Sequence, residues 1–261
     1  MKRYLKIFLV FIKFNLQRSI VYPKDFLMWL TVDIFWSLIN VAFFKVIYLN
    51  IPTISGWSFN EMVVVLGIIQ ILTGLVWSVM YPNMKQLTQD ANSGKLDLVL
   101  SKPIDSQLML SLRSFNLNIL TSIVIGSSLI DHGLKINNSL NFSSLVLIIF
   151  SLLCMTFIAY GSYFIYSTIS LFYDRLNNIA DVFPHSIDFS RYPTEIFPII
   201  VRFTMSMSFP VIFVTYTPVK ILFKGESYTS LFIMAVVSMT IFFLSSKFWN
   251  FALKHYSSAS S

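Results

Sequence analysis

Six long apolar segments run through this chain, and they constrain its fold more than any other feature of the sequence. A helix of about 20 apolar residues crosses a hydrocarbon core of about 30 Å. Inside that core every backbone amide and carbonyl needs a partner, and an α-helix supplies the partners internally. We therefore predict an all-α integral membrane protein with six transmembrane helices, near residues 26–49, 61–81, 107–130, 142–170, 198–217 and 229–250.

The composition agrees with a membrane protein. Of the 261 residues 56% are hydrophobic and 12% are charged, whereas about 25% of the residues of a soluble domain are charged. The net charge is +7, but the basic residues punctuate apolar segments instead of clustering on one polar face, so we expect no nucleic-acid partner. The single cysteine, Cys154, permits no intrachain disulfide. His132, His185 and His255 lack the close spacing of a zinc motif, so no metal site is expected.

The sequence has no local motif of a nucleotide-hydrolysing enzyme. Gly94 and Lys95 are followed by Leu96 and lack the upstream glycine of a phosphate-binding P-loop, and there is no G-x-S-x-G or H-E-x-x-H. We expect a chain that is not an enzyme and holds no cofactor. If ATP drives it, a partner protein binds the ATP and Mg. A membrane-embedded enzyme that uses Asp131 and His132 stays as a minor alternative.

The first 25 residues form a separate amphipathic segment. Polar side chains share one stripe of a helix, and apolar side chains face away from it: Lys2, Lys6, Lys13 and Gln17 against Leu5, Phe8, Phe11, Ile12 and Leu16. Such a helix lies in the membrane interface with its lysines toward anionic headgroups. We assign residues 26–250 to the membrane domain and 251–261 to a C-terminal cytoplasmic tail, whose final SSASS has a disordered composition.

The basic residues predict the orientation. With the N-terminus inside, 15 of the 19 lysines and arginines face the cytoplasm, and four lie outside or near the outer end of a span, namely Lys45, Lys135, Lys220 and Lys224. The positive-inside rule therefore places both termini in the cytoplasm.

The predicted cytoplasmic loop 82–105 combines charge with a helical pattern. Met84, Leu87 and Ala91 recur at helical spacing beside polar residues, and Gly94 supplies a helix stop. We predict a short amphipathic helix along the inner membrane face, followed by Pro103 and by Asp105 or Ser106 as a cap of the third span. The alternative is a solvated loop whose charges only fix the topology.

Two stretches carry a family resemblance. The pattern G-x-L-D followed by L-x-K-P resembles the loop between the second and third spans of ABC transporter type-2 permeases, with lysine where arginine is usual; its residues are Gly94, Leu96, Asp97, Leu100, Lys102 and Pro103. The stretch from Arg191 to Pro218 resembles the fifth-span region of one branch of that family.

The resemblance implies a six-span permease subunit of an ABC exporter in the bacterial cytoplasmic membrane. Residues 82–93 would form a coupling helix that docks on a separate ATPase subunit, present in two copies, and a second permease subunit, identical or related, would complete the pathway. The implied ATPase-coupling residues are Lys85, Gln89, Asp90, Gly94, Leu96 and Asp97.

Charged residues within the predicted spans suggest further roles. Asp33 and Arg113 lie at similar depths in the first and third spans, and a charge in hydrocarbon needs a partner or water. We hypothesise an Asp33–Arg113 pair; the alternative is that each reaches the headgroups separately. The rival function is an ion-coupled secondary transporter with Asp33 as its proton or sodium site.

Small residues and prolines mark two further features. Ser122 and Gly126 form a small-xxx-small pair that favours close helix packing, and we favour packing within one subunit over a dimer seam. Pro193 and Pro198 disfavour helix at the residues before them, so a hinge is predicted at the start of the fifth span.

Overall fold

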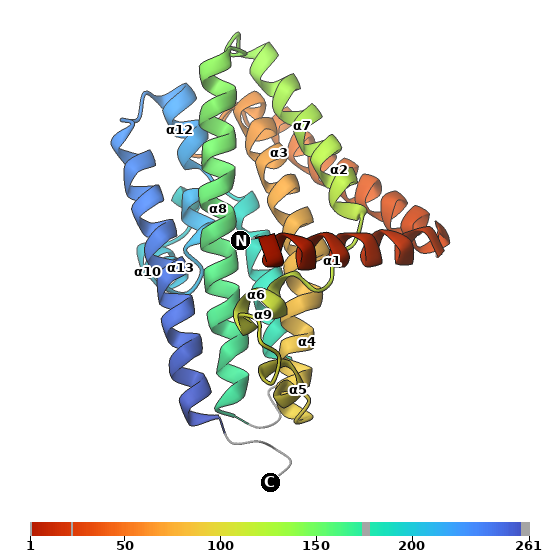
Figure 1. Cartoon of the computed structure of the whole chain (residues 1–261). Coiled ribbons are helices and arrows are strands. Elements are labelled where there is room, and N and C mark those ends of the chain that lie inside the picture. Colours follow the sequence, from red (N-terminus) through yellow and green to blue (C-terminus); the bar gives the residue numbers. More distant parts are fainter. Residues whose placement is uncertain (1, 22, 174–177, 257–261) are drawn as a thin grey trace.

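A computed structural model describes residues 2–21, 23–173 and 178–256, and helices form all of the regular structure in these residues (Figure 1). The longer helices are α1 (Lys2–Val21), α2 (Pro23–Asn50), α3 (Phe59–Leu75), α4 (Tyr81–Asn92), α7 (Asn118–Ile136), α8 (Phe142–Thr168) and α13 (Thr229–His255). Short helices are α5 (Leu96–Leu100), α6 (Ser106–Leu112), α9 (Ile179–Ser186), α10 (Ile199–Ser208), α11 (Val211–Val214) and α12 (Thr217–Lys224). One π-helical turn, η1 (Val76–Met80), and three 3-10 turns, η2 (Ile169–Leu171), η3 (Ile187–Arg191) and η4 (Thr194–Ile196), complete the set.

Five described helices are long and apolar enough to cross a membrane: Pro23–Asn50, Phe59–Asn92, Asn118–Ile136, Phe142–Leu171 and Thr229–His255. The all-helical fold is confirmed, and these helices agree with five of the six predicted spans in order and type. The third is shorter than predicted, because residues 107–117 form α6 and an irregular link before α7 begins. α13 continues to His255, so helix occupies the first part of the predicted tail, and SSASS lies outside the described residues.

The centre of the molecule is the antiparallel pair α3 and α7, which is the most extensive helix contact of the described chain. Glycines let the two backbones approach. A Cβ on Gly126 would lie 2.6 Å from the Gly67 carbonyl oxygen, and one on Gly133 would lie 2.5 Å from Val64 Cγ2. Ser122 occupies the space beside Gly74. The small-residue pair Ser122 and Gly126 therefore packs within this chain, as predicted.

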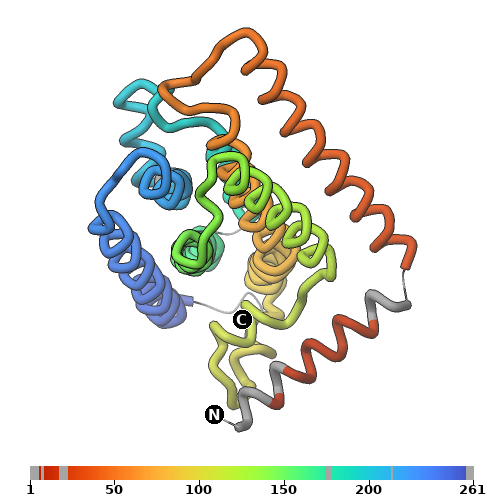
Figure 2. The backbone as a smooth tube through the Cα atoms, turned by 90° about the horizontal axis from the view of Figure 1, so that it is seen from above, coloured from red at the N-terminus to blue at the C-terminus, as the bar shows by residue number. Residues whose placement is uncertain are grey.

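α8 and α13 form the second extensive pair and run side by side in the same direction along the bundle (Figure 1). We call the end of the molecule that carries α5 the hairpin end, and the end that carries residues 51–58 the loop end. α2 lies at the margin of the bundle, and α1 crosses beside it nearly at right angles to the long helices (Figure 2).

The predicted fifth span, 198–217, does not form one continuous helix. Its residues are divided among α10, α11 and the start of α12. Pro198 precedes α10, and the chain leaves helical geometry at Phe209 before α11 begins, because Pro210 disfavours the helical conformation in the residue before it. No residue of α10 is buried.

A different and more polar segment runs along the bundle at this point. α8 and α13 both run toward the hairpin end, so the chain between them has to return to the loop end. α9 and η3 make this return. Asp181 accepts a hydrogen bond from Tyr81 near the hairpin end (2.8 Å), the His185 ring packs on Trp77, and Arg191 donates to Asn40 further along (3.1 Å). Residues 179–191 therefore lie antiparallel to the long helix that contains Trp77 and Tyr81.

The segment that follows dips back into the bundle as a hairpin. Near its tip, the Phe209 ring stacks on Tyr166 and approaches Phe183, which both lie toward the hairpin end. Tyr216 has returned to the loop end, where it packs on Trp57. Ion pairs fasten this region: Lys220 to Glu195 at 2.8 Å and Lys224 to Glu61 at 2.9 Å.

Candidate functional site

The short amphipathic helix predicted in loop 82–105 is formed as α4, but it continues the long helix α3 instead of turning across its end. α4 continues α3 through η1, so that residues 59–92 form one helical rod of 34 residues. At 1.5 Å per residue the rod is about 50 Å long, roughly 20 Å more than a hydrocarbon core. α4 therefore reaches the same end of the bundle as the C-terminal ends of α8 and α13 (Figure 1). Its apolar face, with Met84, Leu87 and Ala91, is buried in the protein itself.

The rod continues through Pro82 without a break. Proline cannot donate to the carbonyl four residues before it, so the Ser78 carbonyl loses its helical partner. The π-helical turn absorbs the misfit, and the backbone amide of Asn116 donates to the Ser78 carbonyl at 2.9 Å. From the sequence alone, Pro82 suggests a helix boundary. In the structure the helix is unbroken, and the carbonyl that Pro82 leaves without a helical partner binds Asn116 of the link before α7.

α4, α5 and α6 form a helical hairpin at the end of the molecule, which we call the tip hairpin (residues 81–112). Gly94 closes α4 with a φ of +71°, and Asp105 caps α6 by accepting from the Leu108 amide at 2.8 Å, as the sequence predicts. Leu96 is fully buried and holds the turn. Leu98, by contrast, is 68% exposed at the extremity, with Lys95 and Lys102 exposed beside it.

Asp90 and Arg113 form a buried ion pair that fixes the two sides of the tip hairpin. Their side chains are 2.7 Å apart and are 11% and 13% exposed. Asp90 is therefore enclosed within this chain and is not displayed to a partner. The predicted Asp33–Arg113 pair is not formed, because Arg113 lies in the link before α7, whereas Asp33 lies within α2.

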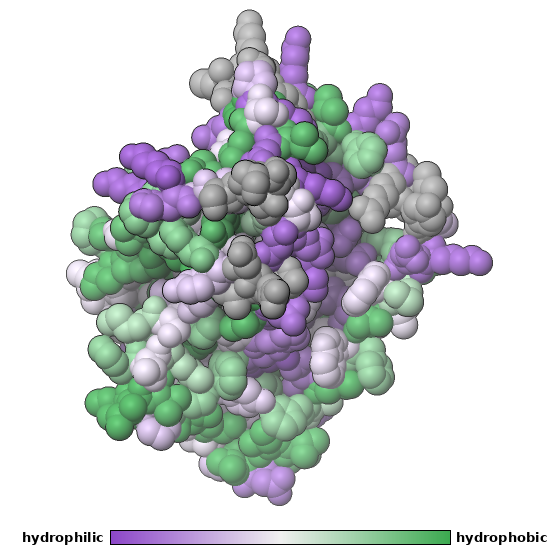
Figure 3. Space-filling view, turned by 90° about the horizontal axis from the view of Figure 1, so that it is seen from below, coloured by the Kyte–Doolittle hydropathy of each residue, from purple (hydrophilic) through white to green (hydrophobic). Residues whose placement is uncertain are grey.

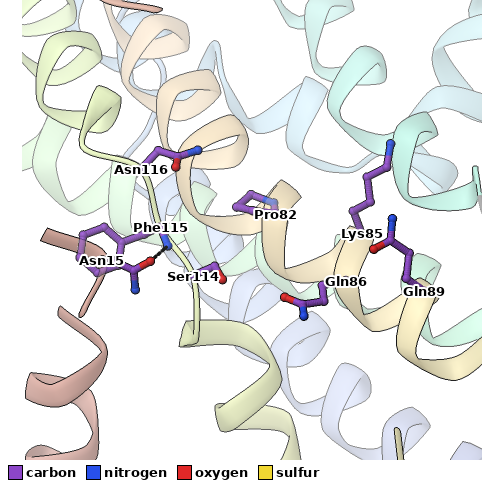
Figure 4. Close-up of a pocket in the computed structure, with 8 residues that line it drawn as sticks. All are labelled: Asn15, Pro82, Lys85, Gln86, Gln89, Ser114, Phe115 and Asn116. Carbon is purple, nitrogen blue, oxygen red and sulfur yellow. Dashed lines mark hydrogen bonds between the residues drawn. The ribbon is translucent and has the colours of Figure 1, made fainter. Parts of the chain in front are cut away.

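Two asparagines organise the irregular link 113–117. Asn83 donates to the Ser114 carbonyl at 2.6 Å and accepts from the Ser114 amide at 3.0 Å. Asn15 of α1 donates to the Arg113 carbonyl at 3.1 Å and accepts from the Phe115 amide at 3.2 Å (Figure 4). These bonds satisfy a backbone that has no helical partners. α1, α4 and the start of α7 therefore meet at this link, which we call the junction.

A pocket of about 300 Å³ opens beside the junction. It is lined by Asn15, Pro82, Lys85, Gln86, Gln89, Ser114, Phe115 and Asn116 (Figure 4). Gln89 is exposed on α4, whereas Lys85 extends away from Asn15 and Ser114. Lys85 pairs with Asp181 of α9 at 3.0 Å and donates to the Tyr81 hydroxyl at 2.8 Å. This cluster joins α4 to α9.

The other predicted residues lie apart from the tip hairpin. Asp33 accepts hydrogen bonds from Gln70 of α3 and Ser122 of α7, both at 2.8 Å. Pro193 and Pro198 bracket η4 and break the chain between η3 and α10. Asp131 pairs with Lys135 on exposed α7 surface, and no set of three or more His, Cys, Asp or Glu in the described residues is arranged to hold a metal ion.

A family model described as an ABC-2 family transporter protein matches residues 34–260 of the chain. The chain belongs to the ABC-2 transporter family. Searches of curated proteins and of solved structures gave no match. The family's permeases lack a nucleotide-binding domain of their own, so this chain is the membrane component of an ABC-2 transporter and a multi-pass membrane protein. The family thereby favours an ABC transporter over the ion-coupled and enzymatic alternatives.

Sequence reasoning missed Leu98, Asn15 and Asn83. The exposure of Leu98 depends on which face of α5 packs inward, and five residues are too few for a periodic pattern. The asparagines act on backbone about 30 and 100 residues away in sequence, which no local motif encodes.

Proposed function

We propose that this ABC-2 permease is the membrane subunit of an ATP-driven exporter and that the tip hairpin is its contact with a separate ATPase. The exposure of Leu98 between two exposed lysines at the hairpin end is the observation that carries this proposal. Apolar anchors surrounded by polar residues are typical of protein interfaces. Hydrophilic residues also gather in a band through the middle of this end of the molecule (Figure 3).

The topology proposed here has six crossings, with residues 179–191 as the fifth in place of residues 198–217. The hairpin end faces the cytoplasm, and α1 lies in the inner interface. Arg191 and Arg202 then belong to the outer half, which changes the predicted distribution of the described basic residues to twelve inside and six outside; Arg175 lies outside the described residues. The positive-inside rule still favours cytoplasmic termini.

Force from the ATPase would pass through two attachments of α4. The junction connects the tip hairpin to α1 and α7 through Asn15, Asn83 and the Ser78 carbonyl. The Lys85–Asp181 pair connects α4 to the fifth crossing. A rigid rod that bears on both elements can transmit a displacement of its tip across the membrane, and Pro193 and Pro198 are the proposed hinge beyond the crossing.

The assembly we propose contains two permease subunits, identical or related, and two ATPase copies that bind ATP and Mg. It would lie in the bacterial cytoplasmic membrane and move its substrate outward.

The test is purification of the complex in mild detergent from cells that express the chain together with its ATPase partner. Replacing the anchor with Leu98→Glu is expected to remove the ATPase from the complex, whereas Leu98→Met retains it. Leu140→Glu, an exposed leucine at the loop end, is the matched control and is expected to change nothing. Full retention of the ATPase by Leu98→Glu would disprove the contact.

A further inference from the structure

Asp33 places a carboxylate inside the region that spans the membrane. α2 begins at Pro23, so Asp33 lies ten residues along it, or about 15 Å at 1.5 Å per residue. α2 is inclined to the long axis of the bundle (Figure 1), so the depth of Asp33 in a hydrocarbon core of about 30 Å is less than this distance. A charged group there costs roughly 2.5–3.5 kcal/mol on insertion scales, and such residues usually serve substrate or ion pathways.

Neutral groups alone contact this carboxylate in the structure. Gln70 and Ser122 donate to its two oxygens, and no salt bridge joins Asp33 to a basic residue in the described ranges 2–21, 23–173 and 178–256. Arg191 of η3 contacts the same face of α2 two turns further along, where it bonds Asn40. Arg191 is already neutralised by Asp188 at 2.8 Å. The negative charge of Asp33 is therefore not balanced locally.

The carboxylate belongs to a polar stripe on an otherwise apolar helix. Asp33, Ser37 and Asn40 recur at helical spacing on the side of α2 that faces α3 and α7, while the opposite side exposes large apolar side chains such as Phe35 and Leu38. We call the contact between this stripe and the body of the bundle the polar seam.

The polar seam is thinly packed. Only 11% of the most apolar window of α2 is buried inside the protein, against 72% for the rod that contains α3. The cavity within the seam, lined by Ser37, Asn40, Gln70 and Arg191 among others, has a volume of about 10 Å³. The seam is closed in this conformation, and Asp33 itself remains partly exposed at its edge.

We propose that the polar seam is the recognition site for the positively charged group of an amphiphilic substrate, with Asp33 as its counter-ion. The inference rests on the proposed transport function and names the substrate class. A cation beside Asp33 gains an attraction that water does not screen, whereas an anion of equal shape is repelled. The apolar part of the substrate remains in the bilayer while α2 moves away from α3 and α7 to admit the charged group.

The test is a binding measurement on the permease alone in nanodiscs of zwitterionic phosphatidylcholine, with empty nanodiscs subtracted. The probes are tetraphenylphosphonium and tetraphenylborate, a lipophilic cation and anion of nearly the same shape. The native protein is expected to bind the cation at least tenfold more tightly than the anion. Asp33→Asn, which keeps an oxygen to accept hydrogen bonds, should lose that preference, and Asp33→Glu should keep it. Asp131→Asn, an exposed carboxylate at the loop end, should behave as the native protein does.

A second variant guards against misfolding of Asp33→Asn. Ser37→Asp places another carboxylate on the same stripe, one helical turn from Asp33, and is expected to strengthen cation binding. Equal binding of both probes by the native protein, an unchanged preference in Asp33→Asn, or no gain in Ser37→Asp would each overturn the proposal. If Asp33 had only a structural role, Asp33→Asn would bind the two probes with the same preference as the native protein. Because the measurement needs no ATPase, its failure leaves the proposed coupling function untouched.

Discussion

At the scale of single residues, the Asp90–Arg113 pair stabilises the tip hairpin only while both partners are present. Nε and Nη2 of Arg113 are buried and lack hydrogen-bond partners within the described structure, so Asp90 is what compensates the guanidinium. Breaking such a pair from one side costs about 3–5 kcal/mol, whereas replacing both partners with apolar residues is often neutral.

We predict that Asp90→Leu lowers the melting temperature of the detergent-solubilised protein strongly and that Arg113→Met added to it restores most of the loss. Thermal unfolding followed by circular dichroism checks both variants. A double variant as unstable as Asp90→Leu alone would show that the pair does not explain the loss.

Glu195 and Lys220 predict a pH dependence at the loop end. Burial tends to raise the pKa of the Glu195 carboxyl, but the hydrogen bond and charge of Lys220 outweigh it and hold this pKa below its ordinary value of 4.5. A group whose pKa is lower in the folded state stabilises the fold above its unfolded pKa and loses that contribution as the pH falls through the folded one.

The difference in melting temperature between the native protein and Glu195→Gln should therefore be full above about pH 5 and shrink below the ordinary pKa of glutamate. Other carboxyl groups titrate in both proteins and cancel in the difference. Melting curves at both ends of this range measure it, and a difference that grows on acidification would contradict the assignment.

At the scale of elements, the close approach of α3 and α7 depends on glycine. A methyl group on Gly126 would lie 2.5 Å from Ile71 Cγ1 and 2.6 Å from the Gly67 carbonyl oxygen, and the backbone oxygen cannot move aside without separating the helices. Overpacking of this kind costs about 1–3 kcal/mol. Gly126→Ala should lower the melting temperature accordingly, while Ser127→Ala, on the exposed side of α7, should leave it unchanged. Equal stabilities would mean that the pair tolerates a wider spacing.

The elements that hydropathy predicted are those whose environment is lipid or a uniformly apolar core. α2, α3, α8 and α13 belong to this class, and so does most of α7. Hydropathy did not predict residues 179–191. Their charged side chains, Asp181, Asp188 and Arg191, have partners inside the protein, so the segment does not need an apolar sequence. The local signals of Gly94 and Asp105 were predicted correctly, since a helix stop and a cap act within a few residues. Partners such as Asp90 and Arg113, or Asp33 and Gln70, depend on the tertiary arrangement and were not predictable from spacing.

At the scale of the whole molecule, α4 connects the tip hairpin to the helices α1, α7 and α9 of the bundle. The rod 59–92 is rigid because its helix is continuous, and it is attached at the junction to α1 and α7 and at Asp181 to α9. α2 is attached mainly through polar contacts along the seam. A displacement of the tip hairpin would therefore be transmitted through α7 to Ser122 and through α9 to Arg191. Both residues contact α2 in the polar seam.

This scheme requires residues 179–191 to cross the membrane, and site-directed labelling tests the crossing directly. In a Cys154→Ser background, single cysteines at Asn178 and Glu226, both exposed, lie on opposite sides of the membrane if the segment crosses. We expect a membrane-impermeant maleimide added to intact cells to label Glu226→Cys and not Asn178→Cys, and inverted vesicles to give the reverse. Ser101→Cys in the tip hairpin and Leu140→Cys at the loop end provide the inner and outer references. Labelling of positions 178 and 226 from the same side would mean that the chain does not cross the membrane between them. α13 would then begin on the side where α8 ends, which contradicts the parallel packing of these two helices.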